Sequence, residues 1–217
     1  IPVSFTPTRY LSVPDAEWSL RHYETLLAKP EWAAGVWLSI RIGLLASHLA
    51  QYQIEKLLEN LIEGYMRALG ETDPARRQQI WDLLRTTELQ LSEQFGQLAT
   101  EMARVDAALT RVSTLPLALP FADQWWPSAS FDLRQAFKIH AEGIERAVRN
   151  DAQRAPKDKA FTLMAELFLM QHTCHWYCKS KPVASARLMA RHQTGYAQVI
   201  DAVDPATRRA YLALVKG

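Results

Sequence analysis

The stretch His172–Cys178 (HTCHWYC) concentrates the residue types that bind transition metals. Thiolates and imidazoles together are the usual ligands of zinc, and here Cys174 and Cys178 stand beside His172 and His175. On a helix, however, the two thiols share one face, while the two imidazoles lie to either side of it. One ion could not easily collect all four. We therefore treat His172, Cys174, His175 and Cys178 as weak metal candidates, and we expect no metal and no cofactor.

Other catalytic chemistry has less support. A carboxylate-bridged di-iron bundle needs Glu-x-x-His pairs, and the chain has none. His140, Glu142, Glu145 and Glu166 could form only a looser site. His48 or His140 could ligate a haem, although a buried, hydrogen-bonded histidine is the alternative for each. The chain also lacks a G-x-S-x-G elbow, a phosphate loop and a dinucleotide fingerprint. A metal- or haem-binding helical enzyme is therefore the third hypothesis, behind two non-enzymatic ones.

Basic residues gather in the C-terminal part of the chain. Residues 154–217 carry ten Lys and Arg against four Asp and Glu, whereas residues 1–153 carry 15 against 19. Such a region could neutralise phosphates, or it could dock on the acidic part of the same chain. The candidate nucleic-acid contacts in it are Lys179, Lys181, Arg187, Arg191, Arg208 and Arg209.

The N-terminal order of elements gives a second indication of nucleic-acid binding. A short alternating segment, Thr8–Val13, precedes a helix from Pro14 to about Ala28, a turn at Lys29-Pro30 and a longer helix. Over about Phe5–Ala50 this order resembles ribbon-helix-helix DNA-binding regulators, including the extended type found in conjugative mobile elements. The resemblance implies that two chains pair their strands into a ribbon that enters the major groove. The strand residues that it would assign to DNA are Thr8, Arg9, Tyr10 and Ser12. The alternative is an arm that packs on the helical part of its own chain.

The element that organises the rest is a heptad seam between Trp81 and Val112. Its positions alternate three and four apart, which predicts one long helix from Pro74 to about Val112. They are Trp81, Leu84, Glu88, Leu91, Phe95, Leu98, Met102, Val105, Leu109 and Val112. A second long helix is expected from about Glu31 to Leu69, and the short turn between them predicts an antiparallel hairpin.

The hairpin has a predicted register. Folding the chain about residue 72 sets the stripe Leu38–Tyr52 against the seam and Lys56 opposite Glu88. Because a buried carboxylate is costly unless it is paired, we predict a structural pair of Lys56 and Glu88. Further helices are expected from Ser128 or Ser130 to about Arg154, over Lys157–Ser180, from Pro182 to about Val203, and from Pro205.

Composition agrees with an all-α fold. The chain of 217 residues has 8 Gly, 11 Pro and 48% hydrophobic residues, enough for a core. We expect an extended arm over 1–13, the first helix and hairpin over 14–114, and a smaller helical part over 115–217 packed on the hairpin. The longest apolar run, Gly35–Ala50, is short for a membrane span and contains Arg41 and His48, so no membrane contact is expected.

Two function hypotheses remain. The first is a DNA-binding regulatory protein that acts as a homodimer without catalysis. The second is a helical protein–protein interaction or scaffold protein that holds a partner through exposed parts of the hairpin. Because two cysteines four residues apart fit reduced thiols better than a disulfide, we expect a cytoplasmic protein.

Overall fold

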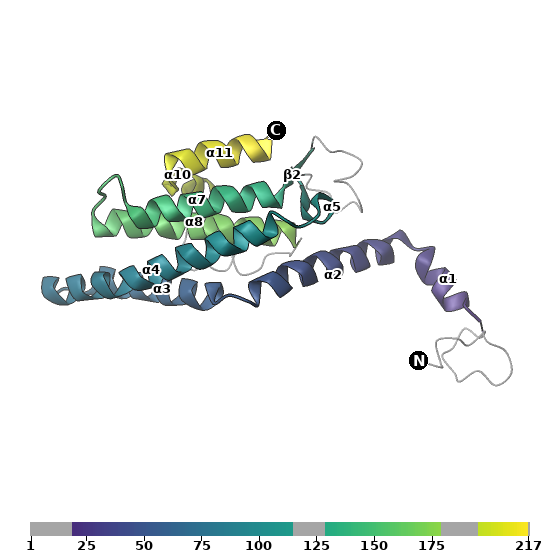
Figure 1. The fold of residues 1–217 in the computed structure, drawn as a ribbon, viewed down its shortest axis with the longest axis horizontal. Helices are drawn as coiled ribbons and strands as arrows, with labels where there is room; N and C mark the ends of the chain where they lie inside the picture. The colour runs from purple at the N-terminus through teal and green to yellow at the C-terminus, as the bar shows by residue number, and fades with distance from the viewer. Residues whose placement is uncertain (1–18, 115–128, 179–194, 217) are drawn as a thin grey trace.

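The computed structural model describes residues 19–114, 129–178 and 195–216. Apart from two very short strands, its elements are helices, which confirms the all-α class (Figure 1). In chain order they are α1 (Arg21–Leu27), α2 (Pro30–Leu49), α3 (Ile54–Gly70), α4 (Pro74–Met102), α5 (Ala107–Thr110), β1 (Arg111–Ser113), β2 (Ser130–Asp132), α7 (Leu133–Arg149), α8 (Pro156–Tyr177), α10 (Tyr196–Ala202) and α11 (Pro205–Lys216). The expected arm over 1–13, its strand Thr8–Val13 and the helix start at Pro14 lie outside the described residues.

The central hairpin is formed by α3 and α4. Asp73 caps α4 by accepting a hydrogen bond from the Ala75 N–H, and Pro74 occupies the first turn, where it needs no N–H. The seam on α4 is buried as the heptad spacing predicts, at Leu84, Glu88, Leu91, Phe95, Leu98 and Met102. Helix α3 packs against this seam and buries Ile54, Leu57, Leu58, Leu61, Ile62, Tyr65 and Ala68.

The expected helix from Glu31 to Leu69 is broken into α2 and α3. At the break, the Gln53 N–H donates to the side-chain oxygen of Gln94 on α4 at 2.8 Å, instead of continuing the helical ladder. The seam therefore packs mainly against α3, and the register built on Leu38–Tyr52 is wrong. Ile42, which belongs to that stripe, is exposed.

Glu88 is paired, but its partner is not Lys56. The Tyr65 hydroxyl donates to Glu88 Oε1 at 2.6 Å, and Lys159 of α8 forms an ion pair with Oε2. Lys56 is exposed on α3. The predicted pair of Lys56 and Glu88 is therefore wrong, because a helix from the C-terminal half supplies the cation.

The seam helix also ends earlier than expected, at Met102 rather than at Val112. Asp106 accepts a hydrogen bond from the Ala108 N–H and so caps the separate short helix α5. Strand β1 follows and pairs antiparallel with β2, with Val112 opposite Phe131. Strands of three residues are too short to show alternation in a sequence.

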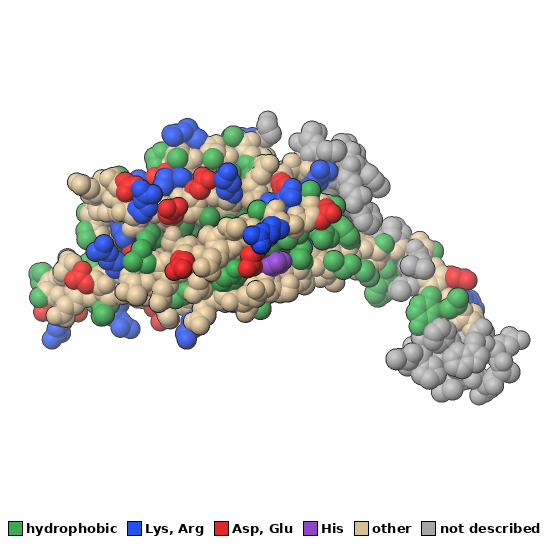
Figure 2. Space-filling view, in the orientation of Figure 1, with side chains coloured by type: hydrophobic (Ala, Val, Ile, Leu, Met, Phe, Trp, Pro, Cys, Tyr) green, Lys and Arg blue, Asp and Glu red, His purple; other side chains and the backbone are tan. Residues whose placement is uncertain are grey.

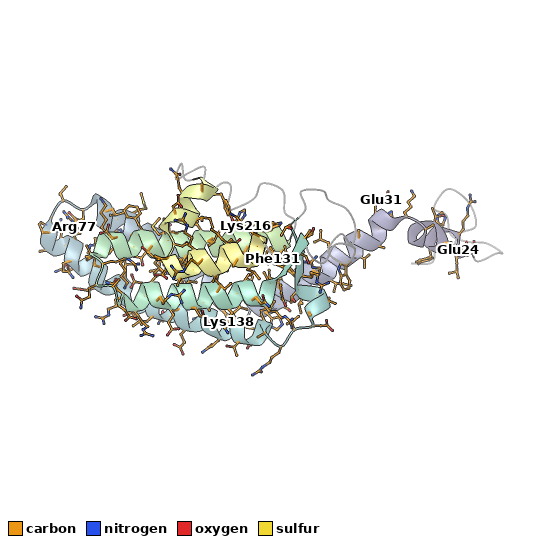
Figure 3. All side chains as sticks on the ribbon, turned by 90° about the horizontal axis from the view of Figure 1, so that it is seen from above. Glu24, Glu31, Arg77, Phe131, Lys138 and Lys216 are labelled. Atoms are coloured by element: carbon orange, nitrogen blue, oxygen red, sulfur yellow. The ribbon has the colours of Figure 1, made fainter. Side chains whose placement is uncertain are left out.

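The C-terminal helices pack on the hairpin as a second layer. Helix α7 lies against both α4 and α8, α10 packs on α8, and α11 packs on α7 (Figures 1 and 3). Asp132 caps α7 at its start, and Asn150 ends it in the left-handed region, with φ of 54°. Helix α8 agrees with the expected Lys157–Ser180 up to Tyr177, and Cys178, the last described residue of that stretch, is its C-cap.

Helices α1 and α2 form an arm on one side of the molecule. The first half of α2 and all of α1 project beyond the packed helices (Figures 1 and 3). Glu24 and Glu31 mark this arm in Figure 3, and Arg77 marks the opposite end of the molecule. The arm thus exposes large apolar side chains of α2, among them Trp32 and Val36, to solvent.

Candidate interaction surface

The outer face of α2 is apolar and exposed. We use this name for the exposed residues Trp32, Ala33, Gly35, Val36, Ser39, Ile40, Ile42, Gly43, Ala46 and Ser47, none of which carries a charge. Glu31, in the first turn of α2, is exposed and charged and does not belong to this set. Trp32, Val36 and Ile40 leave 55%, 56% and 49% of their surface exposed. Figure 2 shows hydrophobic side chains gathered along this helix. A contiguous apolar surface of this kind usually marks a binding site.

The opposite face of α2 is anchored by Arg41. This side chain is almost fully buried, its Nη2 donates to the Arg111 carbonyl, and its guanidinium lies 4.4 Å from the centre of the Tyr177 ring. The Tyr177 hydroxyl donates to the Leu109 carbonyl at 2.8 Å. Burial raises the pKa of Tyr177, and the nearby Arg41 opposes that rise. The second half of α2 is therefore fixed to β1 and α8 while its outer face stays open.

An elbow pocket lies where α2 meets α3. It has a volume of about 590 Å³. Ala46 and Ala50 line it from the α2 side, and Glu55, Lys56 and Glu59 line it from α3. The pocket exists because the helix is broken at residues 50–53, and it continues the outer face of α2 at Ala46.

By length and composition, α2 is also the one described helix that could cross a membrane. Its stretch Glu31–Leu49 has a mean hydropathy of 1.2, and only 11% of it is buried. In this structure, however, Arg41 near its centre is held against Arg111 and Tyr177. A spanning arrangement would have to break these contacts and place the guanidinium in lipid, which is costly.

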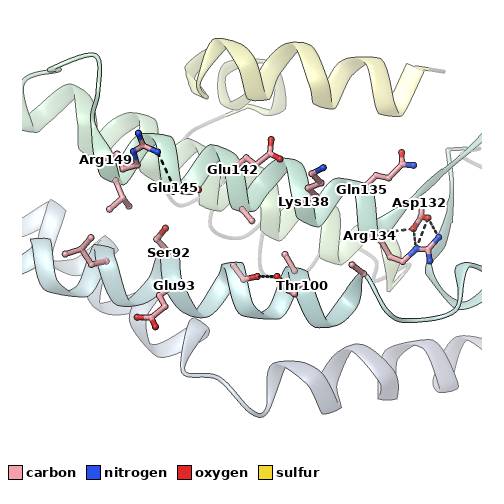
Figure 4. Close-up of a pocket in the computed structure, with 16 residues that line it drawn as sticks. Ser92, Glu93, Thr100, Asp132, Arg134, Gln135, Lys138, Glu142, Glu145 and Arg149 are labelled. Atoms are coloured by element: carbon pink, nitrogen blue, oxygen red, sulfur yellow. Dashed lines mark hydrogen bonds and ion pairs between the residues drawn. The ribbon is translucent and has the colours of Figure 1, made fainter.

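A second concave surface runs between α4 and α7 (Figure 4). Its volume is about 880 Å³, and its lining includes the small residues Gly96, Ala99 and Ala141. Its rim is charged, but the charges are largely paired along α7: Arg134 with Asp132, and Arg149 with Glu145. This groove could hold an apolar segment, although its rim offers little uncompensated charge to select one.

His140 lies in a closed polar cluster. Its Nε2 is 2.9 Å from the Thr173 hydroxyl, which also donates to the Leu169 carbonyl and lies 3.2 Å from the Tyr211 hydroxyl. Burial lowers the pKa of His140 to about 3, so its ring is neutral. Because His140 and Thr173 are fully buried, they are core residues and not an accessible catalytic pair. This geometry gives His140 the role of a buried, hydrogen-bonded histidine.

Glu166 forms a second buried polar cluster. Its Oε1 accepts a hydrogen bond from the Asp204 N–H at 2.9 Å. Arg146 donates to the Thr207 hydroxyl at 3.0 Å and pairs with Asp204 at 3.2 Å. Burial raises the pKa of Glu166 to about 7, against the lowering effect of the Asp204 N–H and the Thr207 hydroxyl. The cluster joins α7, α8 and the start of α11.

The weak metal candidates do not form a metal site. Among the described residues, no group of three or more His, Cys, Asp or Glu is arranged to hold an ion. Burial raises the pKa of Cys174 to about 12 and also raises that of Cys178. Burial lowers the pKa of His172 and of His175. Burial thus disfavours the thiolate form of both cysteines, which is the form that binds metals.

Of the residues predicted to contact nucleic acid, the structure describes two. Arg208 and Arg209 are exposed on α11, and Arg208 pairs with Asp201 at 2.8 Å. The other eight lie outside the described residues: Thr8, Arg9, Tyr10, Ser12, Lys179, Lys181, Arg187 and Arg191. DNA binding and the ribbon-helix-helix resemblance therefore stay predictions.

None of the site residues predicted from the sequence lies on the outer face of α2. The signal was present, because residues 32–47 carry a single charge, at Arg41. This face was not expected to be exposed, because the stripe Leu38–Tyr52 was assigned to the seam and the helix was therefore treated as covered.

Comparisons of the chain with protein-family models, with curated proteins and with solved structures found no match.

Proposed function

We propose that this chain is a helical interaction protein that holds another polypeptide on the outer face of α2. The observation that carries the proposal is the exposure of a long, uncharged helix face on a projecting arm. Burying such side chains stabilises a complex by about 25 cal/mol for each Å² of apolar surface removed from water. Helix faces of this type are common docking elements for other helices.

The relief of the outer face suits the close approach of another helix. Small residues at Gly35, Ser39 and Gly43 alternate with larger ones, and this relief allows the backbone of another helix to approach closely. The anchor at Arg41 also keeps the second half of α2 on the body of the protein. Held in this way, the arm leaves the outer face of α2 open to a partner beside the protein.

Site-specific photocrosslinking in cells tests this proposal. A benzophenone amino acid replaces Val36 on the outer face, and a matched control replaces Leu83, which is 75% exposed on α4. We expect illumination to attach a polypeptide of defined mass at position 36 and none at position 83. The proposal fails if position 36 gives no polypeptide adduct, or if the label enters lipid instead.

A further inference from the structure

We infer that the polypeptide held by the outer face of α2 is a second copy of this chain, packed antiparallel so that Trp32 of each copy enters the elbow pocket of the other. The inference rests on the proposed function and names its partner. It follows from how the outer face and the elbow pocket are spaced along α2.

The outer face is complementary to itself in the antiparallel direction. If a two-fold axis passes between Ser39 and Ile40, Val36 of one copy lies opposite Gly43 of the other, and Ile40 lies opposite Ser39. A Cβ added at Gly43 would meet nothing within 4 Å, so the space above it is open. Each larger side chain therefore meets a small one, as close helix packing requires. A two-fold interface of this kind is closed and uses the same patch twice.

The elbow pocket lies at the distance that this arrangement needs. At 1.5 Å per residue, Trp32 lies about 11 Å from the axis, and position 47 lies about 11 Å on the other side. That position falls between Ala46 and Ala50, which line the pocket. A pocket of about 590 Å³ has ample room for an indole ring, and a large aromatic side chain that fills such a pocket is the usual anchor of an interface.

The charges at the ends of the interface are also complementary. Lys29, the residue before α2, lies three residues before Trp32, is exposed, and has no ion pair among the residues that the structure describes. In the antiparallel arrangement it approaches the pocket rim of the other copy, where Glu55 and Glu59 stand with Lys56. The rim carries one net negative charge. The two-fold symmetry repeats this contact at both ends, which sets the register of the two copies.

Sedimentation of the purified full chain tests the inference. We expect a dimer, and we expect Trp32→Ala to raise its dissociation constant by about 30-fold or more, because it removes the anchor. Val36→Arg should give a monomer. Leu83→Arg, which places the same charge at an exposed apolar site on α4, should leave the dimer unchanged. A wild-type monomer at every concentration overturns the inference, as does a dimer that Val36→Arg leaves intact.

Engineered disulfides test the register. Ser39→Cys stands next to the axis and should crosslink two identical chains under mild oxidation. Ser47→Cys should not crosslink with itself, whereas Gly43→Cys should crosslink with a chain that carries Val36→Cys, a pair that leaves Trp32 in place. The native Cys174 and Cys178 are partly buried with raised pKa values, so they react slowly. Faster self-crosslinking of Ser47→Cys than of Ser39→Cys would indicate a different register and overturn the inference.

The two tests separate the inference from the proposed function. If the purified chain is a monomer but position 36 still captures a polypeptide of another mass, the second copy is wrong and the interaction surface stands. If position 36 captures no polypeptide and the chain is a monomer, both fail.

Discussion

Glu166 on α8 accepts a hydrogen bond from the Asp204 N–H, and this contact ties the middle of α8 to the start of α11. The side chain is fully buried. Because burial raises its pKa from 4.5 to about 7, the folded protein holds this proton more tightly than the unfolded chain does. The stabilising effect of the protonated form is complete below pH 4.5 and is lost as the pH rises to about 7.

Glu166→Gln should therefore remove part of the pH dependence of stability. Glutamine keeps an oxygen that can accept from the Asp204 N–H and cannot ionise. Relative to wild type, we expect the variant to gain on the order of 3 kcal/mol of unfolding free energy between pH 4.5 and 7. Urea denaturation at several pH values measures this difference.

The comparison needs a control, because His140 acts in the opposite direction. Its pKa is lowered to about 3, so its contribution is present above pH 6.5 and is lost as the pH falls. Taking the difference between variant and wild type cancels this effect. Glu63→Gln, at an exposed site on α3, should show no such pH-dependent gain. An equal gain in both variants would contradict the role of Glu166.

Lys159 should be far more important for stability than Lys56. Lys159→Met leaves Glu88 buried with only the Tyr65 hydroxyl beside it, and breaking a buried ion pair typically costs about 3–5 kcal/mol. Lys56→Met changes an exposed residue and should stay within about 0.5 kcal/mol of wild type. Chemical denaturation of the two variants compares them directly.

A double variant checks the cause. Adding Glu88→Gln to Lys159→Met removes the uncompensated charge, so it should recover a part of the lost stability. If the double variant is less stable than Lys159→Met alone, the unpaired carboxylate is not the source of the loss.

The sequence predicts the packing of a helix correctly where a single apolar face determines which residues are buried. The heptad spacing identified the buried positions of α4 from Leu84 to Met102, and Pro74 marked its start. The predicted register of the hairpin was wrong because two apolar stripes could each pack on the seam. Periodicity alone does not choose between Leu38–Tyr52 and the stripe on α3. The choice depends on tertiary contacts such as the hydrogen bond between Gln53 and Gln94.

The interaction surface was less predictable than the core. Apolar residues on a helix indicate burial, whether by the same chain or by another one. Ile40 and Ile42 therefore carry the same sequence signal as Leu45, although Leu45 is buried and the two isoleucines are exposed. Only the positions of β1 and α8 show that the Arg41 side of α2 is the covered one.

The anchor of α2 should control the order of the arm. Arg41→Met removes the hydrogen bond to the Arg111 carbonyl and the contact with the Tyr177 ring. We expect faster amide hydrogen exchange over residues 41–49, with little change in α7 or α8, because local openings follow local contacts. Arg67→Met, at an exposed site on α3, is the control. Unchanged exchange over residues 41–49 would show that other contacts hold the helix.

Two glycine substitutions should have opposite effects on stability. A Cβ at Gly143 would lie 2.4 Å from both Glu166 Oε2 and Thr207 Oγ1, whereas a Cβ at Gly96 would meet nothing within 4 Å. Alanine favours a helix by about 1 kcal/mol over glycine, so Gly96→Ala should stabilise the protein by about that amount. Overpacking costs about 1–3 kcal/mol, so Gly143→Ala should be destabilised despite the same helical gain. Thermal unfolding of the two variants measures the contrast, and a stabilised Gly143→Ala would show that the Glu166 cluster can move to make room.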